Sequence, residues 1–446
     1  MTILHDILIP LQSSFSSTPL GKSRAQIFVY SLMSIIIPFT SSMTSNLFRS
    51  LVTLFGFDMN RALYYRFMAT STLPWNKLWS ITWNLIPSPI TDGYLILALD
   101  DCINTKVGKK IFACETVFDH AAKPNQSKYV WAQNFVCVGL LKMVKGRWAC
   151  LPLAFLFYIP LKTIVAEKLN AIKSRKVVKF KTKMEQSAQM ILKIAHHFSN
   201  HPVLVVADSW FGNKGLYKLI NGKTDNCIFL LSRLRANNNL FDLPKPKPKK
   251  TRGAKRKYGD KLGNATDLAS KFKSLAKFYM IKNLYGKTRE VLAYEQIFML
   301  KTLKCPVRVV WVYRRTQWVA FFTTDLNLSV EQIISFYSGR WKIESNFKEL
   351  KGDIGSQKSQ TRNAHAVTNH LQFCMMSATL TWIYADRLKS DPERRHKVKG
   401  RTSFVFSDIR RIMAEEVLDD NFDRLCSKSA KPIIKSFIPT LLRMVA

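Results

Sequence analysis

Apolar and polar positions follow two different periods along the chain. Over residues 1–90 the apolar positions recur at helical spacing, as in QIFVYSLMSIII and WNKLWSITWNLI, and Pro87 and Pro89 end this part. Amphipathic runs at 185–198 and 213–221 predict two more helices. Short apolar runs typical of buried strands lie at 94–100, 131–143, 148–159, 202–208 and 226–235.

The order of these elements indicates a fold class. Three strands, the last two joined by a hairpin, precede an alternation of helix and strand, which predicts an α/β layer around a mixed five-stranded sheet with flanking helices. Several short β runs then lie between 276 and 326, and helical periodicity resumes at 329. We expect a helical N-terminal domain (1–90), an α/β core in two parts (91–235 and 328–390), a mostly β insertion with a basic loop (236–327) and a helical C-terminal region (391–446).

The chain carries a large positive charge. Its 446 residues include 68 Lys or Arg against 30 Asp or Glu, a formal charge of +38, and 47% of them are hydrophobic. That hydrophobic content is enough for a buried core, so the chain is not a disordered basic tail. The charge indicates a polyanionic partner, with nucleic acid first and an anionic membrane surface second. The excess concentrates at 168–183, 241–263 and 387–401.

The cysteines and the apolar runs limit the cellular setting. The eight cysteines include no C-x-x-C pair, so we expect reduced thiols in a cytosolic protein rather than disulfides or a zinc site. The first residues lack the pattern of a secretory leader. The longest uncharged apolar run, 148–161, has 14 residues, whereas a membrane-spanning helix needs about 20. We therefore expect a cytoplasmic protein without a membrane partner.

Carboxylates follow two of the predicted buried strands. Asp100 and Asp101 end the first strand, and Asp208 ends the fourth. An acidic group at the end of an apolar strand is costly to bury and often lies at the open edge of an α/β sheet. One such residue alone is more often a structural cap. Two such strand ends favour a metal-dependent phosphoryl-transfer site, because Mg²⁺ takes carboxylate oxygens from separate elements.

A third acidic residue lies on the helix predicted around YSGRWKIESNFKELK. At about 100° per residue, Tyr337, Arg340, Glu344 and Lys351 form one polar stripe, while the apolar residues face another side. A solvated row of salt bridges on a surface helix gives the same periodicity. The helical pattern alone therefore does not distinguish an active site from an exposed helix face.

The spacing of these four residues resembles the Y-R-E-K signature of the DDE transposases encoded by bacterial insertion sequences. The segments ALDDCINTKVGKKI and VVADSWFGNKGLY are similar to those around the first and second catalytic aspartates of that family, and FDH at 118–120 is also similar. The first aspartate of the family is usually followed by Thr, which favours Asp101 over Asp100. Cys102 stands here in place of that Thr.

The resemblance implies a ribonuclease-H-like core in which Asp101, Asp208 and Glu344 are catalytic and bind two Mg²⁺ or Mn²⁺. Tyr337, Arg340 and Lys351 would bind DNA phosphates. Such an enzyme cleaves double-stranded DNA at the terminal inverted repeats of its element and joins the 3′-hydroxyl to target DNA. It also implies a homodimer on DNA, near the bacterial nucleoid, without an organic cofactor.

Two other functions stay open at this point. One is a transposase-derived DNA-binding protein that no longer catalyses, and the other is a different ribonuclease-H-like nuclease. Among further candidates, His197 and His201 have metal-ligand spacing, and Trp311 and Trp318 could stack on a base, but a structural role is favoured for each. The N-terminal helices either bind DNA ends or only pack on the core.

Overall fold

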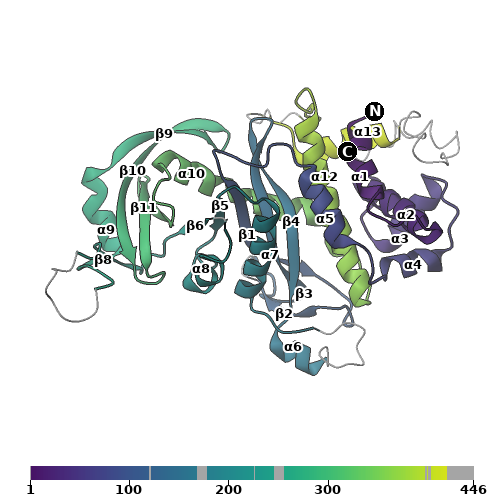
Figure 1. The fold of residues 1–446 in the computed structure, drawn as a ribbon, viewed down its shortest axis with the longest axis horizontal. Coiled ribbons are helices and arrows are strands. Elements are labelled where there is room, and N and C mark those ends of the chain that lie inside the picture. Colours follow the sequence, from purple (N-terminus) through teal and green to yellow (C-terminus); the bar gives the residue numbers. More distant parts are fainter. Residues whose placement is uncertain are drawn as a thin grey trace.

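The computed structural model describes residues 2–119, 122–167, 178–225, 227–245, 256–396, 399 and 403–418 (Figure 1). His120 and parts of all three basic segments lie outside these residues. So does the C-terminal region beyond residue 418. Within the described part, no helix is long and apolar enough to cross a membrane. The seven described cysteines form no disulfide.

Five helices occupy the N-terminal part, as its periodicity predicts. Threonine side chains cap the first two, at Thr2 and Thr18, and Asn60 caps the fourth. Helix α2 is buried along most of its length, so it packs inside the protein and does not form an exposed recognition helix. The helices are α1 (Ile3–Gln12), α2 (Pro19–Ile36), α3 (Thr44–Thr53), α4 (Arg61–Met68) and α5 (Trp75–Asn84).

The five predicted strands are all present and lie side by side. Their order in the sheet is β4-β3-β1-β5-β6, with β1 antiparallel to β3 and parallel to β5, and with β5 parallel to β6. An additional strand, β2 (Cys114–Phe118), pairs with the start of β3 and was not predicted. The five are β1 (Leu95–Thr105), β3 (Tyr129–Val144), β4 (Arg147–Tyr158), β5 (Val203–Ala207) and β6 (Ile228–Arg233).

The inserted region continues the same sheet instead of forming a separate one. Strand β12 pairs antiparallel with β6, so that the whole sheet has 12 strands, and β11, β10 and β9 follow outward (Figure 1). The predicted five strands are therefore one part of a larger mixed sheet. The inserted elements are β7 (Asn239–Phe241), β8 (Lys261–Asn264), α9 (Ala265–Phe272), β9 (Lys277–Leu284), β10 (Lys287–Leu300), β11 (Cys305–Tyr313) and β12 (Trp318–Thr323).

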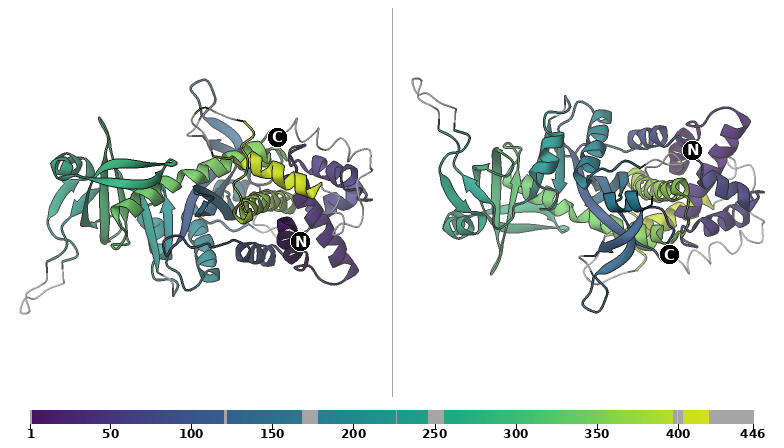
Figure 2. Two further views of the ribbon diagram at one scale, coloured as in Figure 1. Left: turned by 90° about the horizontal axis from the view of Figure 1, so that it is seen from above. Right: turned by 90° about the horizontal axis from the view of Figure 1, so that it is seen from below.

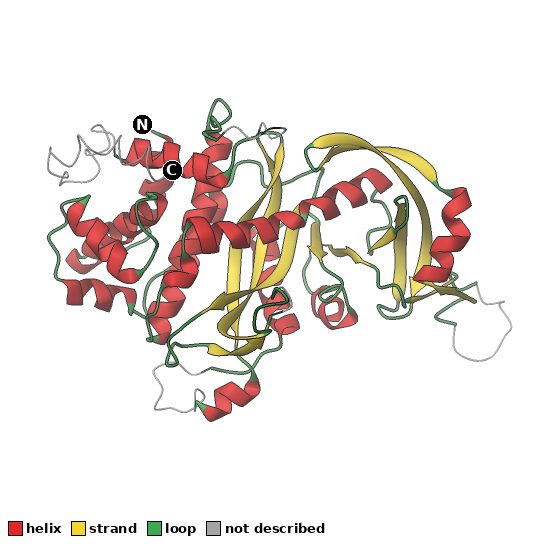
Figure 3. Ribbon diagram, turned by 180° about the vertical axis from the view of Figure 1, so that it is seen from behind, coloured by secondary structure: helices red, strands yellow, loops and turns green. Residues whose placement is uncertain are grey.

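Helices cover both faces of the central strands. Helices α7 and α8 lie over one face, and the nearly continuous helix formed by α10 and α11 crosses the other, from the insertion toward β4 (Figures 1 and 3). Views from above and below show the insertion and the N-terminal helices at opposite ends of the molecule (Figure 2). The remaining helices are α6 (Leu161–Ala166), α7 (Lys183–His197), α8 (Lys214–Ile220), α10 (Val330–Gly339), α11 (Trp341–Lys348), α12 (Ala364–Arg387) and α13 (Phe406–Val417).

Helix α12 joins the N-terminal helices to the sheet. It packs against β4 on one side and against α2, α4 and α5 on the other, and most of its side chains are buried. Two of the three tryptophans of α5 contact it: the indole N–H of Trp75 donates to Asn369 at 2.7 Å and that of Trp79 to Gln372 at 2.5 Å. The central strands and the N-terminal helices consequently share one hydrophobic core.

Phe373 of α12 is the natural place to test this shared core. Its ring is fully buried and contacts Phe28, Phe67 and Trp75 from three N-terminal helices. We expect Phe373→Ala to lower the free energy of unfolding by about 3–5 kcal/mol in urea denaturation, because it leaves a cavity between the two parts. Leu20→Ala is the control, since Leu20 is 62% exposed and its loss should change stability by about 0.5 kcal/mol at most.

Candidate active site

Asp100, midway along β1, lies next to Asp208, which directly follows β5. The first strand was expected to end at Asp100 and Asp101, but it continues to Thr105. Strands β1 and β5 pair in parallel with Leu99 beside Ala207, so the following residues, Asp100 and Asp208, continue the same register. Residues in matching register on adjacent parallel strands point to the same face of the sheet. The acidic charge of Asp208 acts on Asp100, which agrees with this proximity. Backbone N–H groups of Trp210 and Phe211 donate to Asp208 Oδ1, both at 3.0 Å, and fix the loop after β5.

Arg340 connects Asp100 to Glu344. The side chain of Arg340 lies between α10 and α11, on the face of the sheet that these helices cover, and it is almost completely buried. Its Nη1 is 3.3 Å from Asp100 Oδ2 and its Nη2 is 2.9 Å from Glu344 Oε1. The rings of Tyr337 and Trp341 lie 5.7 and 5.4 Å from the guanidinium carbon. Four of the predicted site residues, Asp208, Tyr337, Arg340 and Glu344, thus gather around Asp100.

Asp101 lies on the opposite face of the sheet. Successive side chains of a strand point to opposite faces, so Asp101 faces α7 while Asp100 faces α11. Lys183, at the start of α7, forms an ion pair with Asp101 Oδ2 at 2.8 Å. The Lys183 ammonium also lies over the rings of Tyr158 and Trp210, at 5.2 and 5.5 Å. The structure therefore brings Asp100, and not Asp101, next to Arg340.

Lys351 reaches the same face of β1 as Asp100. The lysine lies in a π-helical turn, Glu349–Asp353 (η2), that replaces the regular helix expected there. Its ammonium lies near the Cys102 thiol, two residues beyond Asp100. Burial raises the pKa of this thiol to about 12, and the positive charge of Lys351 opposes the rise. The predicted stripe is thus assembled by an interrupted helix, with a change of geometry between Glu344 and Lys351.

The electrostatics of the site favour a bound positive charge. Burial raises the pKa of Asp100 from 3.8 to about 7, Arg340 lowers it, and Asp208 raises it. Carboxylate oxygens are the ligands that Mg²⁺ and Mn²⁺ prefer, so the donor chemistry fits a divalent cation beside Asp100 and Asp208. Glu344 is instead paired with Arg340. Within the described ranges no three His, Cys, Asp or Glu side chains are close enough together to hold a metal ion.

A groove leads away from Arg340 along the insertion. It encloses about 1010 Å³ between α10 and strands β9 to β12. Arginine is the dominant charged residue of its lining, which contains Arg233, Arg289, Arg314 and Arg340 but only one acid, Glu290. Large aromatic side chains are exposed along it, namely Phe278, Tyr285 and Trp341. Guanidinium groups and exposed rings are the side chains that bind phosphates and bases of a nucleic acid strand.

Two of the weaker candidates, Trp311 and His197, make contacts that are typical of a structural role. Trp311 is fully buried in the insertion and its indole N–H donates to the Ala265 carbonyl at 3.1 Å, whereas Trp318 lines the groove. His197 bonds to Asn84 at 2.9 Å and packs its ring against Trp83. The buried setting of Trp311 leaves its ring no surface on which a base could stack.

A comparison with protein families identifies this arrangement. Residues 42–294, more than half of the chain, match the family model of the DDE superfamily endonucleases. The chain belongs to this family. The matched region includes Asp100, Asp101 and Asp208 but ends before Glu344. No curated protein matches the chain. The family assignment supports a nuclease that acts on DNA, and it confirms the resemblance to DDE transposases.

Several residues at the site of this DDE endonuclease were not found from the sequence. Lys183 begins α7 and Arg233 ends β6, and no spacing rule connects either residue to the motifs. Trp210 lies within the second motif, but its contact with Lys183 depends on the fold. Trp341 directly follows Arg340 in the sequence, so a contact between its ring and the guanidinium could have been predicted from the motif. The pairing of β1 with β5 shows that Asp100, and not Asp101, is in register with Asp208.

The crowded setting of Asp100 predicts a pH-dependent stability. Its pKa in the folded DDE endonuclease, about 7, is above the ordinary 3.8, so the carboxyl group lowers the stability of the fold progressively as the pH rises from about 4 to about 7, and the full loss is present above pH 7. In metal-free buffer we expect Asp100→Asn to melt at a higher temperature than the wild type above pH 7. This gain should disappear as the pH falls from about 7 to about 4.

Asp101→Asn provides the matched control for this measurement. It changes the neighbouring residue in the same way, but it removes an ion pair with Lys183 instead of a crowded charge. We expect no gain in melting temperature for this variant at any pH. An equal gain for both variants would contradict the placement of Asp100 beside Asp208.

Proposed function

We propose that the chain is a DNA transposase that cleaves strands at the ends of a mobile element and transfers the 3′-hydroxyl into target DNA. The observation that carries the proposal is the in-register pair Asp100 and Asp208, joined through Arg340 to Glu344. Asp residues from two adjacent strands and a Glu from a later helix are the three carboxylates that the family name describes. We propose Asp100 for the first of them, in place of the Asp101 that the motif alone favours.

The carboxylates would bind the divalent cations. Asp100 and Asp208 would hold Mg²⁺ or Mn²⁺ directly, and Glu344 would join them after leaving Arg340. When bound, such ions activate the attacking hydroxyl and stabilise the leaving oxygen of a phosphodiester. Asp100 would then be ionised, because a nearby cation favours the carboxylate over the acid.

Arg340 would exchange its carboxylates for a phosphate. Its guanidinium lies close to the rings of Tyr337 and Trp341, and the Nε atom has no hydrogen-bond partner among the described residues. A phosphate offers the bidentate geometry that guanidinium groups prefer. Tyr337 and Lys351 would add a hydroxyl and an ammonium on the same side, which orients the scissile strand over Asp100. The arginine-rich groove would hold the adjoining nucleotides.

The domain organisation and the partners belong to the same proposal. Strands β1 and β3 to β6 would form the ribonuclease-H-like core, divided at residues 91–235 and 328–390 by the insertion. The helical domain at 1–90 would contact DNA through its exposed side, where Arg49, Arg61 and Arg66 lie. Two copies would bind the paired element ends in the bacterial cytoplasm.

The carboxylate assignment can be tested by DNA nicking. The substrate is linear DNA carrying the inverted repeats that bracket the gene, with Mg²⁺ or Mn²⁺. We expect Asp100→Asn, Asp208→Asn and Glu344→Gln to reduce cleavage by about 10³-fold or more while DNA binding stays intact. Asp101→Asn should stay within about 10-fold of the wild type, because it faces Lys183.

The same assay separates the three functions. Cleavage followed by joining to a second DNA supports the transposase, cleavage without joining supports another ribonuclease-H-like nuclease, and binding without cleavage supports an inactive descendant. Loss of cleavage in Asp101→Asn together with full activity in Asp100→Asn would overturn the choice of Asp100.

The groove predicts a salt-dependent contribution to DNA binding. Each arginine that neutralises a phosphate changes the slope of log affinity against log salt by about one. We expect Arg289→Ala and Arg314→Ala each to reduce the slope by about one, measured by fluorescence anisotropy. Lys271→Ala is the control, because this lysine is exposed on α9 and does not line the groove. Equal slopes for all three variants would place the DNA elsewhere.

A further inference from the structure

The segment that carries Lys351 lacks regular helical support. Residues 349–359, here called the Lys351 segment, comprise the π-helical turn, Gly355 in the left-handed region (φ 78°) and a short 3₁₀ turn, Ser356–Lys358 (η3). A side chain at Gly355 would place its Cβ 2.9 Å from Ser41 Cβ. Backbone groups in such a segment need partners from outside it, because few of them pair with one another.

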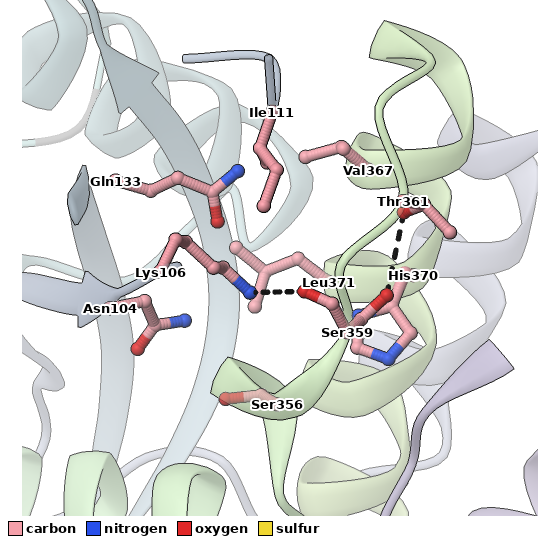
Figure 4. Close-up of a pocket in the computed structure, with 10 residues that line it drawn as sticks. All are labelled: Asn104, Lys106, Ile111, Gln133, Ser356, Ser359, Thr361, Val367, His370 and Leu371. Atoms are coloured by element: carbon pink, nitrogen blue, oxygen red, sulfur yellow. Dashed lines mark hydrogen bonds between the residues drawn. The ribbon is translucent and has the colours of Figure 1, made fainter. Parts of the chain in front are cut away.

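Lys106 supplies two of these partners. It directly follows β1, and its ammonium donates to the Gln357 carbonyl at 2.9 Å. The ammonium also donates to the Ser359 carbonyl at 2.8 Å (Figure 4). Its own backbone N–H donates to the Trp131 carbonyl of β3 at 2.9 Å, so the backbone of Lys106 is held by the central sheet. The ammonium therefore ties the end of the Lys351 segment to the central sheet.

Lys106 occupies a closed, tightly packed space. The lysine is 8% exposed, and burial lowers its pKa to about 8. The cavity beside it measures about 10 Å³, which is room for one water molecule, and no described carboxylate lines it. Asn104 Oδ1 and Ser356 Oγ face this space without a hydrogen-bond partner in the described part of the chain. Among the described residues, the two carbonyls are the hydrogen-bond partners of the ammonium.

A buried charge without a carboxylate partner is costly, and neutral side chains can also bond to carbonyls. What the lysine adds is length, two strong charge-assisted bonds and a rigid connection across to the segment. The connection starts six residues after Asp100 on the same strand, and Lys351 contacts Cys102 between them. The strand that presents Asp100 thus also determines where Lys351 lies.

We infer that Lys106 is a positioning residue, which sets the distance between Asp100 and Lys351 by holding the Lys351 segment against β1. The inference rests on the proposed function, since it assigns Lys351 to the scissile phosphate. Lys106 itself touches no substrate, because it is buried behind the segment it holds. Arg410 and the Ser42 backbone hold the other side of the same segment, at the carbonyls of Asp353 and Ile354.

The test combines Lys106→Met with Lys351→Ala in the full-length protein. At saturating DNA and Mg²⁺ we expect Lys106→Met to slow single-turnover cleavage by about 10-fold or more, with DNA affinity within about two-fold of the wild type. The double variant should be no slower than Lys351→Ala alone, because both changes remove the same contact. Lys106→Gln, which keeps one donor, should lie between the wild type and Lys106→Met.

Lys142→Met is the matched control. Lys142 is another buried lysine that donates to a backbone carbonyl, that of Pro87, but it also pairs with Asp386 and lies far from the site on β3. This variant should lose thermal stability without a fall in the cleavage rate measured on the folded protein. Equal slowing by Lys142→Met and Lys106→Met, or fully additive effects of Lys106→Met and Lys351→Ala, would overturn the inference.

Hydrogen exchange separates a failure of the inference from a failure of the proposed function. If the wild type does not cleave DNA, the proposed function fails. Lys106 is then judged by amide exchange of residues 352–360 alone. We expect Lys106→Met and Lys106→Gln to increase exchange there by about 10-fold or more and Lys142→Met to leave it unchanged. Unchanged exchange in both Lys106 variants would overturn the positioning role whatever the activity.

Discussion

The parallel pairing of β1 with β5 is the constraint on which the site depends. It places Asp100, midway along β1, beside Asp208, which directly follows β5. Burial, with a smaller contribution from the charge of Asp208, raises the pKa of Asp100 to about 7. Buried like charges destabilise a fold, so the surrounding structure must supply positive charge. Arg340 supplies it, and the helix that carries Arg340 therefore has to cross this face of the sheet close to β1.

Helices α10 and α11 cross this face of the sheet, and a π-helical turn follows them. The rings of Tyr337 and Trp341 lie 5.7 and 5.4 Å from the Arg340 guanidinium carbon, and ion pairs with Asp100 and Glu344 restrain it further. Beyond Glu344 the regular helix changes to a π-helical turn, which points Lys351 toward Cys102. A continuous α-helix would have kept Lys351 on the stripe with Glu344 but would not have set its distance from β1. The break transfers that task to contacts with distant parts of the chain, including Lys106.

The sequence predicted the central strands and the helices because their apolar periods are strong and local. Its family motif favoured Asp101 over Asp100, but a local motif does not show which of the two shares a face with Asp208, since a shift of one residue moves a side chain to the other face of the sheet. The motif compared neighbours along the chain, whereas the decision depends on the register with β5. The joining of β12 to β6 and the Lys106 contact with Gln357 are likewise pairings between distant residues, for which no local pattern exists.

Pairings between distant residues also connect the N-terminal helices and α13 to the site. Arg410 of α13 donates to the carbonyls of Ile35 and Asp353, and so links the N-terminal helices to the Lys351 segment. The Ser42 backbone pairs with Ile354, and α12 shares its core with α2, α4 and α5. Residue 90 therefore marks a change in the sequence pattern, but the parts of the structure on either side of it are not mechanically independent. If the N-terminal helices contact DNA, the hydrogen bonds of Ser42 and Arg410 are the contacts that connect them to the turn that carries Lys351.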